Sequence, residues 1–391
     1  MNKDFYAYYR IMIFTAILPY LILFIPSRIA GFNLTGWSWV IMLLASIYYI
    51  IKLYAKKTFP VLFWLPWIIL IAVYIVFDFT WAGLQLTFQY LLPVLVGIVA
   101  SSFVYDNEKM NWLFKQILLL TAAIIAIYLY SIYFMDGMTP NTAATPMLLS
   151  IAAALSIGVM YITNKVRYLI LFGLLFLVPL LEVTRMGILV FVVIYMLHFA
   201  NKKILYKSVA IASGAALILI VFNTDAVQEK MFKEGKGNIT DLSFDYYNSE
   251  FMNTSGRSTF IEYYERGISE SPIWGNGPRS DLNLLKDELG AESAVEVCND
   301  YVAVRYYYGN VGLAALLLGF VCTYISVYRN FRKENNPYRY LIHSTVMILT
   351  ITFLMFMYTD NILKYTIFFP NIYFALIGMS YAKYEEVNPI T

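Results

Sequence analysis

Two arginines in the sequence have the chemistry to bind an anion. Arg185 lies in LLEVTRMGIL, and Arg257 lies in NTSGRSTFIEYYERG at the expected start of a short helix. A guanidinium presents a planar fork of N–H donors that matches phosphate oxygens, and free N–H groups at a helix N-terminus add to the attraction. Plainer explanations stay open: Arg185 could snorkel to lipid headgroups, and Arg257 could be a solvated loop cation.

Carboxylates near the start of a later apolar stretch are candidates for a general base. Asp300 and Glu292 are preferred, because either could accept a proton from a sugar hydroxyl. The plainer interpretation is that both are solvated or ion-paired residues of a charged loop.

Further polar residues near the same expected surface are candidates for substrate binding. Arg305 falls inside an apolar stretch, where a charge costs several kcal/mol unless it is paired, so it is either functional or paired. The expected substrate-binding set is Arg279, Arg305, Asn299, Tyr301, Asn141, Asp360 and Asn361.

Several common chemistries have no residues to support them. The sequence contains no GxxxxGK phosphate loop, no HExxH motif and no Asp-x-Asp pair on an expected outer loop. Cys298 and Cys322 are isolated, and His198 is far from His343. We therefore expect no metal and no cofactor, and chemistry that rests on arginines, carboxylates and amides.

The composition indicates that these residues sit on a membrane protein. The chain has 391 residues, of which 60% are hydrophobic and only 14% charged, with a mean hydropathy of +0.64. Soluble domains carry about 25% charged residues. Such an apolar chain predicts an all-α fold, a polytopic transmembrane helical bundle.

Apolar windows of about 17–25 residues predict about twelve spans. They lie near residues 11–27, 34–53, 61–77, 84–103, 112–134, 142–162, 166–181, 187–200, 204–222, 301–328, 340–358 and 362–381. The chain thus divides into a first bundle at 1–222, a large loop at 223–300 and a second bundle at 301–391. The first span follows Lys3 and Arg10 and is expected to be retained rather than cleaved.

Lysines and arginines gather in alternate short loops, which predicts the orientation. The basic loops would be cytoplasmic together with both termini, so the loop at 223–300 would lie outside. Within it, residues 258–266 predict a short helix ended by Gly267, and Leu282, Leu285 and Leu289 predict a second one. Apolar faces on both helices suggest a lid that packs over the bundle.

Three patterns follow one another along the chain in a familiar order. They are Thr184-Arg185-Met186-Gly187; then Gly256-Arg257 followed by Pro272 and Gly275-Asn276-Gly277; then Cys298-Asn299-Asp300-Tyr301-Val302 followed by Gly309-Asn310-Val311-Gly312. Together with the late loop and the expected spans, this order resembles the bacterial O-antigen polymerase and O-antigen ligase superfamily.

The resemblance implies a membrane glycosyltransferase with a GT-C-like bundle in the bacterial plasma (inner) membrane. Its expected activity is the polymerisation of undecaprenyl-diphosphate-linked oligosaccharide repeats into O-antigen or capsular polysaccharide on the outer face. Arg185 and Arg257 would neutralise the leaving diphosphate, and Asp300 or Glu292 would take the acceptor's proton. The implied partners are the lipid-linked oligosaccharide, membrane lipid, a chain-length regulator and a flippase, with no nucleic acid.

One departure from the superfamily pattern bears on the activity. Cys298 stands where ligases of the superfamily place a histidine, and a thiol with a pKa near 8.5 is a poor base at neutral pH. This favours the polymerase. The alternatives that stay open are an O-antigen-type ligase, a lipid-linked-oligosaccharide transporter or flippase, and a membrane protein with a purely structural role.

Overall fold

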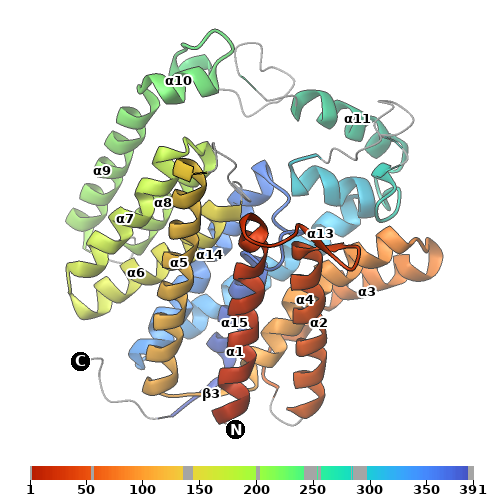
Figure 1. Cartoon of the computed structure of the whole chain (residues 1–391), viewed down its shortest axis with the longest axis horizontal. Helices are drawn as coiled ribbons and strands as arrows, with labels where there is room; N and C mark the ends of the chain where they lie inside the picture. The colour runs from red at the N-terminus through yellow and green to blue at the C-terminus, as the bar shows by residue number, and fades with distance from the viewer. Residues whose placement is uncertain are drawn as a thin grey trace.

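The chain is almost entirely helical in the computed structural model, which describes residues 2–53, 57–134, 144–199, 203–241, 253, 257–282, 284 and 297–385 (Figure 1). Its α-helices, fourteen within these residues, are α1 (Asn2–Ile17), α2 (Leu34–Lys52), α3 (Val61–Phe77), α4 (Trp81–Ser101), α5 (Asn107–Phe134), α6 (Ala144–Thr163), α7 (Arg167–Leu181), α8 (Arg185–His198), α9 (Ile204–Phe222), α10 (Asp225–Met231), α11 (Arg257–Glu270), α13 (Asp300–Phe331), α14 (Pro337–Thr359) and α15 (Pro370–Tyr381). The all-α prediction is confirmed.

Short elements complete the described chain. Two 3₁₀ helices, η1 (Leu18–Leu23) and η3 (Ile239–Asp241), follow α1 and α10. Strands β1 (Arg28–Ile29) and β2 (Phe32–Asn33) form a small antiparallel hairpin. Strands β3 (Val104–Tyr105) and β4 (Lys383–Tyr384) pair in parallel and join the end of the chain to the segment after α4.

The two ends of the bundle differ in structure. The start of α1 and the paired strands β3 and β4 lie at one end (Figure 1), and we call this end the terminal face. The opposite end carries η1, the hairpin of β1 and β2, the turn between α7 and α8, and helices α10 and α11; we call it the loop face.

The core and the periphery of the bundle are distinct. Helices α6, α14 and α15 bury most of their side chains, whereas α9 buries few. Large apolar side chains are well exposed on the outer helices; Phe77 is 84% exposed and Ile204 is 82% exposed. Water would disfavour such a surface, whereas lipid tails solvate it, so the exposed belt is that of a membrane protein.

The prediction of about twelve spans is wrong. Within the described residues, eight helices are long and apolar enough to cross a membrane, which is a multi-pass arrangement. The predicted spans at 61–77, 166–181 and 187–200 form helices of 17, 15 and 14 residues, short of the about 20 that span a bilayer. The last predicted span begins with turns, and its helix, α15, has only 12 residues. Hydropathy windows extend across such turns because the turns are also apolar.

Candidate functional site

Helix α13 is broken near the loop face. Gly309 has φ 64° and ψ −170°, a conformation that divides α13 into an initial segment ending at Tyr308 and a longer segment beyond it. This backbone geometry is essentially restricted to glycine. The span predicted at 301–328 lies within α13, one of the eight candidate spans, and the break interrupts it near its start.

The loop after α11 fills the break in α13. The N–H groups of Asn276 and Gly277 donate to the carbonyls of Tyr306 and Tyr307 at 2.8 and 3.0 Å. In return, the N–H groups of Asn310 and Val311 donate to the carbonyls of Pro272 and Ile273 at 2.9 and 3.2 Å. The main-chain groups that the break leaves without helical partners are thus satisfied by the loop. Two sequence patterns, Gly275-Asn276-Gly277 and Gly309-Asn310, are therefore brought together.

Helix α11 packs against the initial segment of α13. Of the predicted apolar face of Phe260, Ile261 and Tyr264, the last two are buried and Phe260 is partly buried; Ile268 is buried as well. Gly267 was expected to end this helix, but α11 continues to Glu270. Any side chain at Gly267 would overlap the ring of Tyr306, so this glycine permits close packing rather than acting as a cap.

A buried charged network fixes the loop to α11. The Arg279 Nε lies 3.4 Å from Oδ1 of Asp281, and the two side chains are 11% and 0% exposed. The Tyr264 hydroxyl donates to the other oxygen of Asp281 at 2.9 Å. In this structure Arg279, predicted to bind substrate, neutralises a buried carboxylate.

Arg305 is paired, one of the two outcomes that its position predicted. Its Nη1 donates to Oε1 of Glu265 in α11 at 3.2 Å, and its Nε donates to Oδ1 of Asn310 at 3.2 Å. Both charged side chains are 32% exposed, so the pair is accessible at the surface. It links α11 to the segment of α13 that precedes the break.

Asp300 and its neighbours are held by local hydrogen bonds. Asp300 is 1% exposed, and its Oδ2 accepts the N–H of Leu363 at 2.9 Å. Asn299 caps α13 by accepting the N–H of Val302, and the Tyr301 hydroxyl donates to the carbonyl of Leu354. A buried carboxylate that organises a turn is poorly placed to take a substrate proton.

Asp360 and Asn361, both predicted to bind substrate, lie in the turn that follows α14. Asp360 follows the end of α14, and its N–H donates to the carbonyl of Phe356 at 2.9 Å. Asn361 is 6% exposed, and its Oδ1 accepts no hydrogen bond from a described residue. Asn361 therefore keeps an acceptor that a ligand or water can use, and its predicted role stays a prediction.

Arg185 is the first residue of α8, at the loop face. The helix N-terminus beside it has no side-chain cap, because the Thr184 hydroxyl turns instead to the carbonyl of Pro179 at 3.4 Å. The preceding Val183 has φ +52°, an unusual conformation for a β-branched residue. Backbone strain of this kind costs about 1–3 kcal/mol and is concentrated at functional sites.

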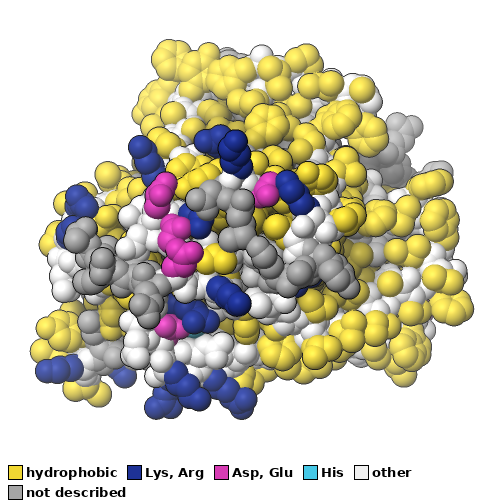
Figure 2. Space-filling model, turned by 90° about the horizontal axis from the view of Figure 1, so that it is seen from below, with side chains coloured by type: hydrophobic (Ala, Val, Ile, Leu, Met, Phe, Trp, Pro, Cys, Tyr) yellow, Lys and Arg dark blue, Asp and Glu magenta, His cyan; other side chains and the backbone are white. Residues whose placement is uncertain are grey.

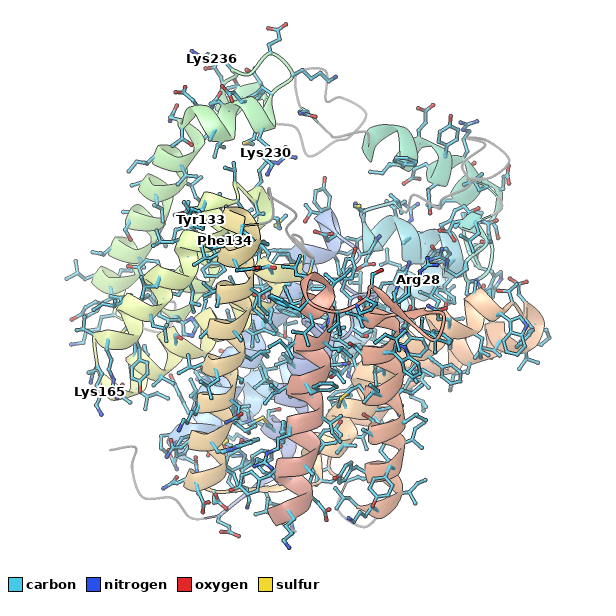
Figure 3. The ribbon with its side chains drawn as sticks, in the orientation of Figure 1. Arg28, Tyr133, Phe134, Lys165, Lys230 and Lys236 are labelled. Atoms are coloured by element: carbon cyan, nitrogen blue, oxygen red, sulfur yellow. The ribbon has the colours of Figure 1, made fainter. Side chains whose placement is uncertain are left out.

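Lys230 of α10 reaches the same turn. Its Nζ donates to the main-chain carbonyl of Glu182 at 3.0 Å. Figure 3 shows Lys230 near the bundle, whereas Lys236 lies farther out along the same segment. Partial desolvation and the neighbouring Arg185 lower the pKa of Lys230, while Glu182 opposes them. Two cations thus share one turn.

Glu182 is a buried carboxylate in this turn. Neither of its oxygens is exposed, and neither accepts a hydrogen bond of normal geometry from the described residues. Burial raises the pKa of Glu182 to about 7, although the nearby Tyr128 hydroxyl and Lys230 ammonium lower it. The carboxyl is therefore about half ionised at neutral pH.

Arg257 begins α11, and the structure gives its place in the chain but not its side chain. The Arg185 Nη1 donates to the carbonyl of Asn253 at 3.4 Å, and the N–H of Asn253 donates to Met231. Four residues of chain span at most about 14 Å, so α11 begins within that length of the Arg185 contact.

Glu292, Asn141 and the predicted second helix near Leu285 and Leu289 lie outside the described residues.

The predicted site residues form two groups at the loop face rather than one cluster. Arg279, Arg305 and Asp300 belong to the side of α11 and α13, whereas Arg185 belongs to the side of α7, α8 and α10 (Figure 1). The residues that sequence reasoning missed are Glu182 and Lys230, which complete the Arg185 turn. The only sequence signal was a glutamate three residues before an arginine between two apolar stretches.

The described residues contain no group of histidine, cysteine and acidic side chains that could hold a metal ion. No protein-family model matches the chain, and no curated protein matches it either.

Proposed function

We propose that the chain is a membrane glycosyltransferase that polymerises lipid-linked oligosaccharide repeats. The observation that carries the proposal is the turn that joins α7 to α8, where Arg185, Lys230 and an uncapped helix N-terminus come together. These three features attract an anion, and a phosphate group matches their hydrogen-bond donors. We call this group the Arg185 site.

The electrostatics of the Arg185 site favour a bound anion. Arg185 and Lys230 repel each other, and the helix N-terminus adds further positive potential. Glu182 offsets this only in part, because about half of it is protonated at neutral pH. A diphosphate would add negative charge beside these cations, and the resemblance to the O-antigen polymerase and ligase superfamily implies the same ligand.

The charge distribution supports an outer location for the Arg185 site. Figure 2 shows the terminal face, on which lysine and arginine side chains gather. Residues near the helix ends at this face include Lys52, Lys109, Lys165, Arg167, Lys203, Lys207, Arg329, Arg332, Lys333 and Arg339. Basic loops remain in the cytoplasm. The terminal face is thus proposed as cytoplasmic and the loop face as the outer side of a bacterial plasma membrane.

In the proposed reaction, an acceptor sugar hydroxyl attacks the anomeric carbon of a lipid-linked glycan. A C–O bond forms, the bond to the lipid diphosphate breaks, and the electron pair leaves with the diphosphate. Preorganised cations stabilise the charge that develops on this leaving group. Arg185 and Lys230 supply that charge here, and Arg257 is the proposed third cation, since α11 begins close to the Arg185 contact. The hydroxyl proton passes to a base, for which Glu292 stays a candidate.

The test compares Arg185→Ala with Arg28→Ala in cells that lack their own copy of the gene. Arg28 is an exposed cation of the β1 hairpin at the same face (Figure 3), so its removal makes the same charge change away from the Arg185 site. We expect the first variant to accumulate single lipid-linked repeats and the second to make the full polymer ladder. A normal ladder from Arg185→Ala would refute the proposal. Long polymer without attachment to its acceptor would instead indicate a ligase.

A further inference from the structure

The most unusual charged group outside the proposed cations is the carboxyl of Glu182. Its oxygens are buried and accept no hydrogen bond of normal geometry from the described residues. Glu182 lies in the turn that holds Arg185, and its own carbonyl accepts the ammonium of Lys230 at 3.0 Å. An anion bound to those cations would therefore lie close to a second negative charge.

We propose that the Arg185 site binds a lipid diphosphate together with one proton, which is taken up by Glu182. The inference rests on the anion site of the proposed function and adds how that site is regulated. A bound diphosphate repels an ionised carboxylate, and like charges favour protonation of the weaker acid. Protonation of Glu182 then removes a negative charge from the turn, so that Arg185 and Lys230 attract the diphosphate more strongly.

The described titratable groups around Glu182 come from α5, η1, α8 and α10. Tyr128 of α5 lies near the carboxyl and offers a hydroxyl donor, and Tyr20 of η1 is a more distant neighbour whose hydroxyl pairs with Thr145 at 3.2 Å. Lys230 of α10 is the cation that acts on the carboxyl directly, and Arg185 of α8 acts on Lys230. Burial raises the pKa of Glu182 to about 7, so the proton can exchange at physiological pH.

The coupling predicts how affinity depends on pH. Binding should take up about half a proton at pH 7 and about one proton at pH 8, because the free carboxyl is then almost fully ionised. The dissociation constant should rise up to about tenfold per pH unit above pH 7.5. The terminal phosphate of a prenyl diphosphate ionises with a pKa of about 6, so its own titration contributes mainly at pH 7.0, and the comparison with Glu182→Gln isolates the share of Glu182.

The test is calorimetric titration of the purified full chain in nanodiscs with farnesyl diphosphate, a short prenyl diphosphate. Measurements at pH 7.0, 8.0 and 8.5, in two buffers with different ionisation enthalpies, give both affinity and proton uptake. Farnesol is the control for the prenyl chain. We expect Glu182→Gln to bind tightly at every pH without proton uptake, and Glu229→Gln, an exposed change on α10, to behave as the wild type.

Each result of the titration supports or overturns a stated part of the proposal. If Glu182→Gln keeps the pH dependence of the wild type, Lys230 carries it and the inference is overturned. If the wild type takes up no proton, the inference is overturned although the anion site stands. If the wild type does not bind farnesyl diphosphate, both the anion site and its coupling are refuted. The polymer ladder of the Arg185→Ala cells tests the polymerase separately.

Discussion

A side chain on Gly275 would begin 2.5 Å from the backbone nitrogen of Gly309. The two glycines come from the loop after α11 and from the break in α13, 34 positions apart in the sequence, and each has a positive φ. The loop can enter the break only because neither residue has a side chain. The attachment of the loop to the bundle is therefore set by main-chain geometry.

Gly309→Ala should destabilise the protein strongly. Alanine disfavours this backbone conformation, and its methyl group would overlap the carbonyl oxygen of Ile273. We expect a loss of at least about 2 kcal/mol, measured as a lower midpoint of thermal unfolding in detergent. Gly173→Ala in α7 is the control, because nothing lies within 4 Å of the added methyl group. Equal midpoints for the two variants would contradict this account.

Asp281→Asn should also destabilise the protein. The change leaves the charge of Arg279 buried without its partner, and breaking one side of a buried pair costs about 3–5 kcal/mol. Thermal unfolding and the rate of proteolysis within α11 would both report the loss. Glu229→Gln makes the same chemical change at an exposed position and should have no effect. A stable Asp281→Asn variant would mean that the network does not hold α11.

Variants of Asp300 separate a structural role from a base. Asparagine keeps an oxygen that can accept the N–H of Leu363, so Asp300→Asn should fold and polymerise almost normally. Alanine removes the acceptor and should cost about 1–3 kcal/mol of stability. Polymer ladders and thermal unfolding measure the two effects. An Asp300→Asn variant that folds normally but makes only single repeats would restore Asp300 as the base.

Arg185→Lys should fail to restore polymer length. Lysine keeps the positive charge but cannot grip a phosphate with two parallel donors. The lysine ammonium also cannot reproduce the hydrogen bond that the guanidinium donates to the carbonyl of Asn253. We expect a ladder much shorter than that of the wild type, with similar amounts of protein in the membrane. Full-length polymer from this variant would show that charge alone suffices at Arg185.

Glu182→Gln should raise stability at alkaline pH. The folded-state pKa of Glu182 is raised from 4.5 to about 7, so ionisation penalises the folded state increasingly from pH 4.5 to 7. Removing the charge should stabilise the protein by up to about 3 kcal/mol at pH 8, at about 1.4 kcal/mol per pK unit. The difference should vanish below pH 4.5. Thermal unfolding at both pH values measures it, and a difference that grows toward acid pH would refute it.

The sequence predicted the helices better than it predicted their breaks. Apolar windows located the helices because burial in lipid requires long apolar segments. They could not reveal that α13 is interrupted, because the 301–328 window stays apolar on average across Gly309 and Asn310. The windows also joined the apolar turns before α15 to its helix and counted the short apolar helices α3, α7 and α8 as spans, which raised the count from eight to twelve.

The candidate site was predicted only in part. Arg185 stood out because a cation next to an apolar stretch is unusual. Glu182 did not, because its burial and raised pKa depend on α5 and α10, which are distant in sequence. Arg279 and Asp300 looked available for substrate, whereas Arg279 pairs with Asp281 in its own loop and Asp300 accepts the N–H of Leu363 from a distant segment.

The break in α13 has a consequence for how such proteins diverge. The loop is held by peptide groups, which every residue except proline provides in full, so substitutions at Ile273 or Trp274 leave the attachment intact. At the junction with α13 itself, the positions that lack side chains are the constrained ones. A distant homologue could thus share this junction while keeping two glycines and little else of the surrounding sequence.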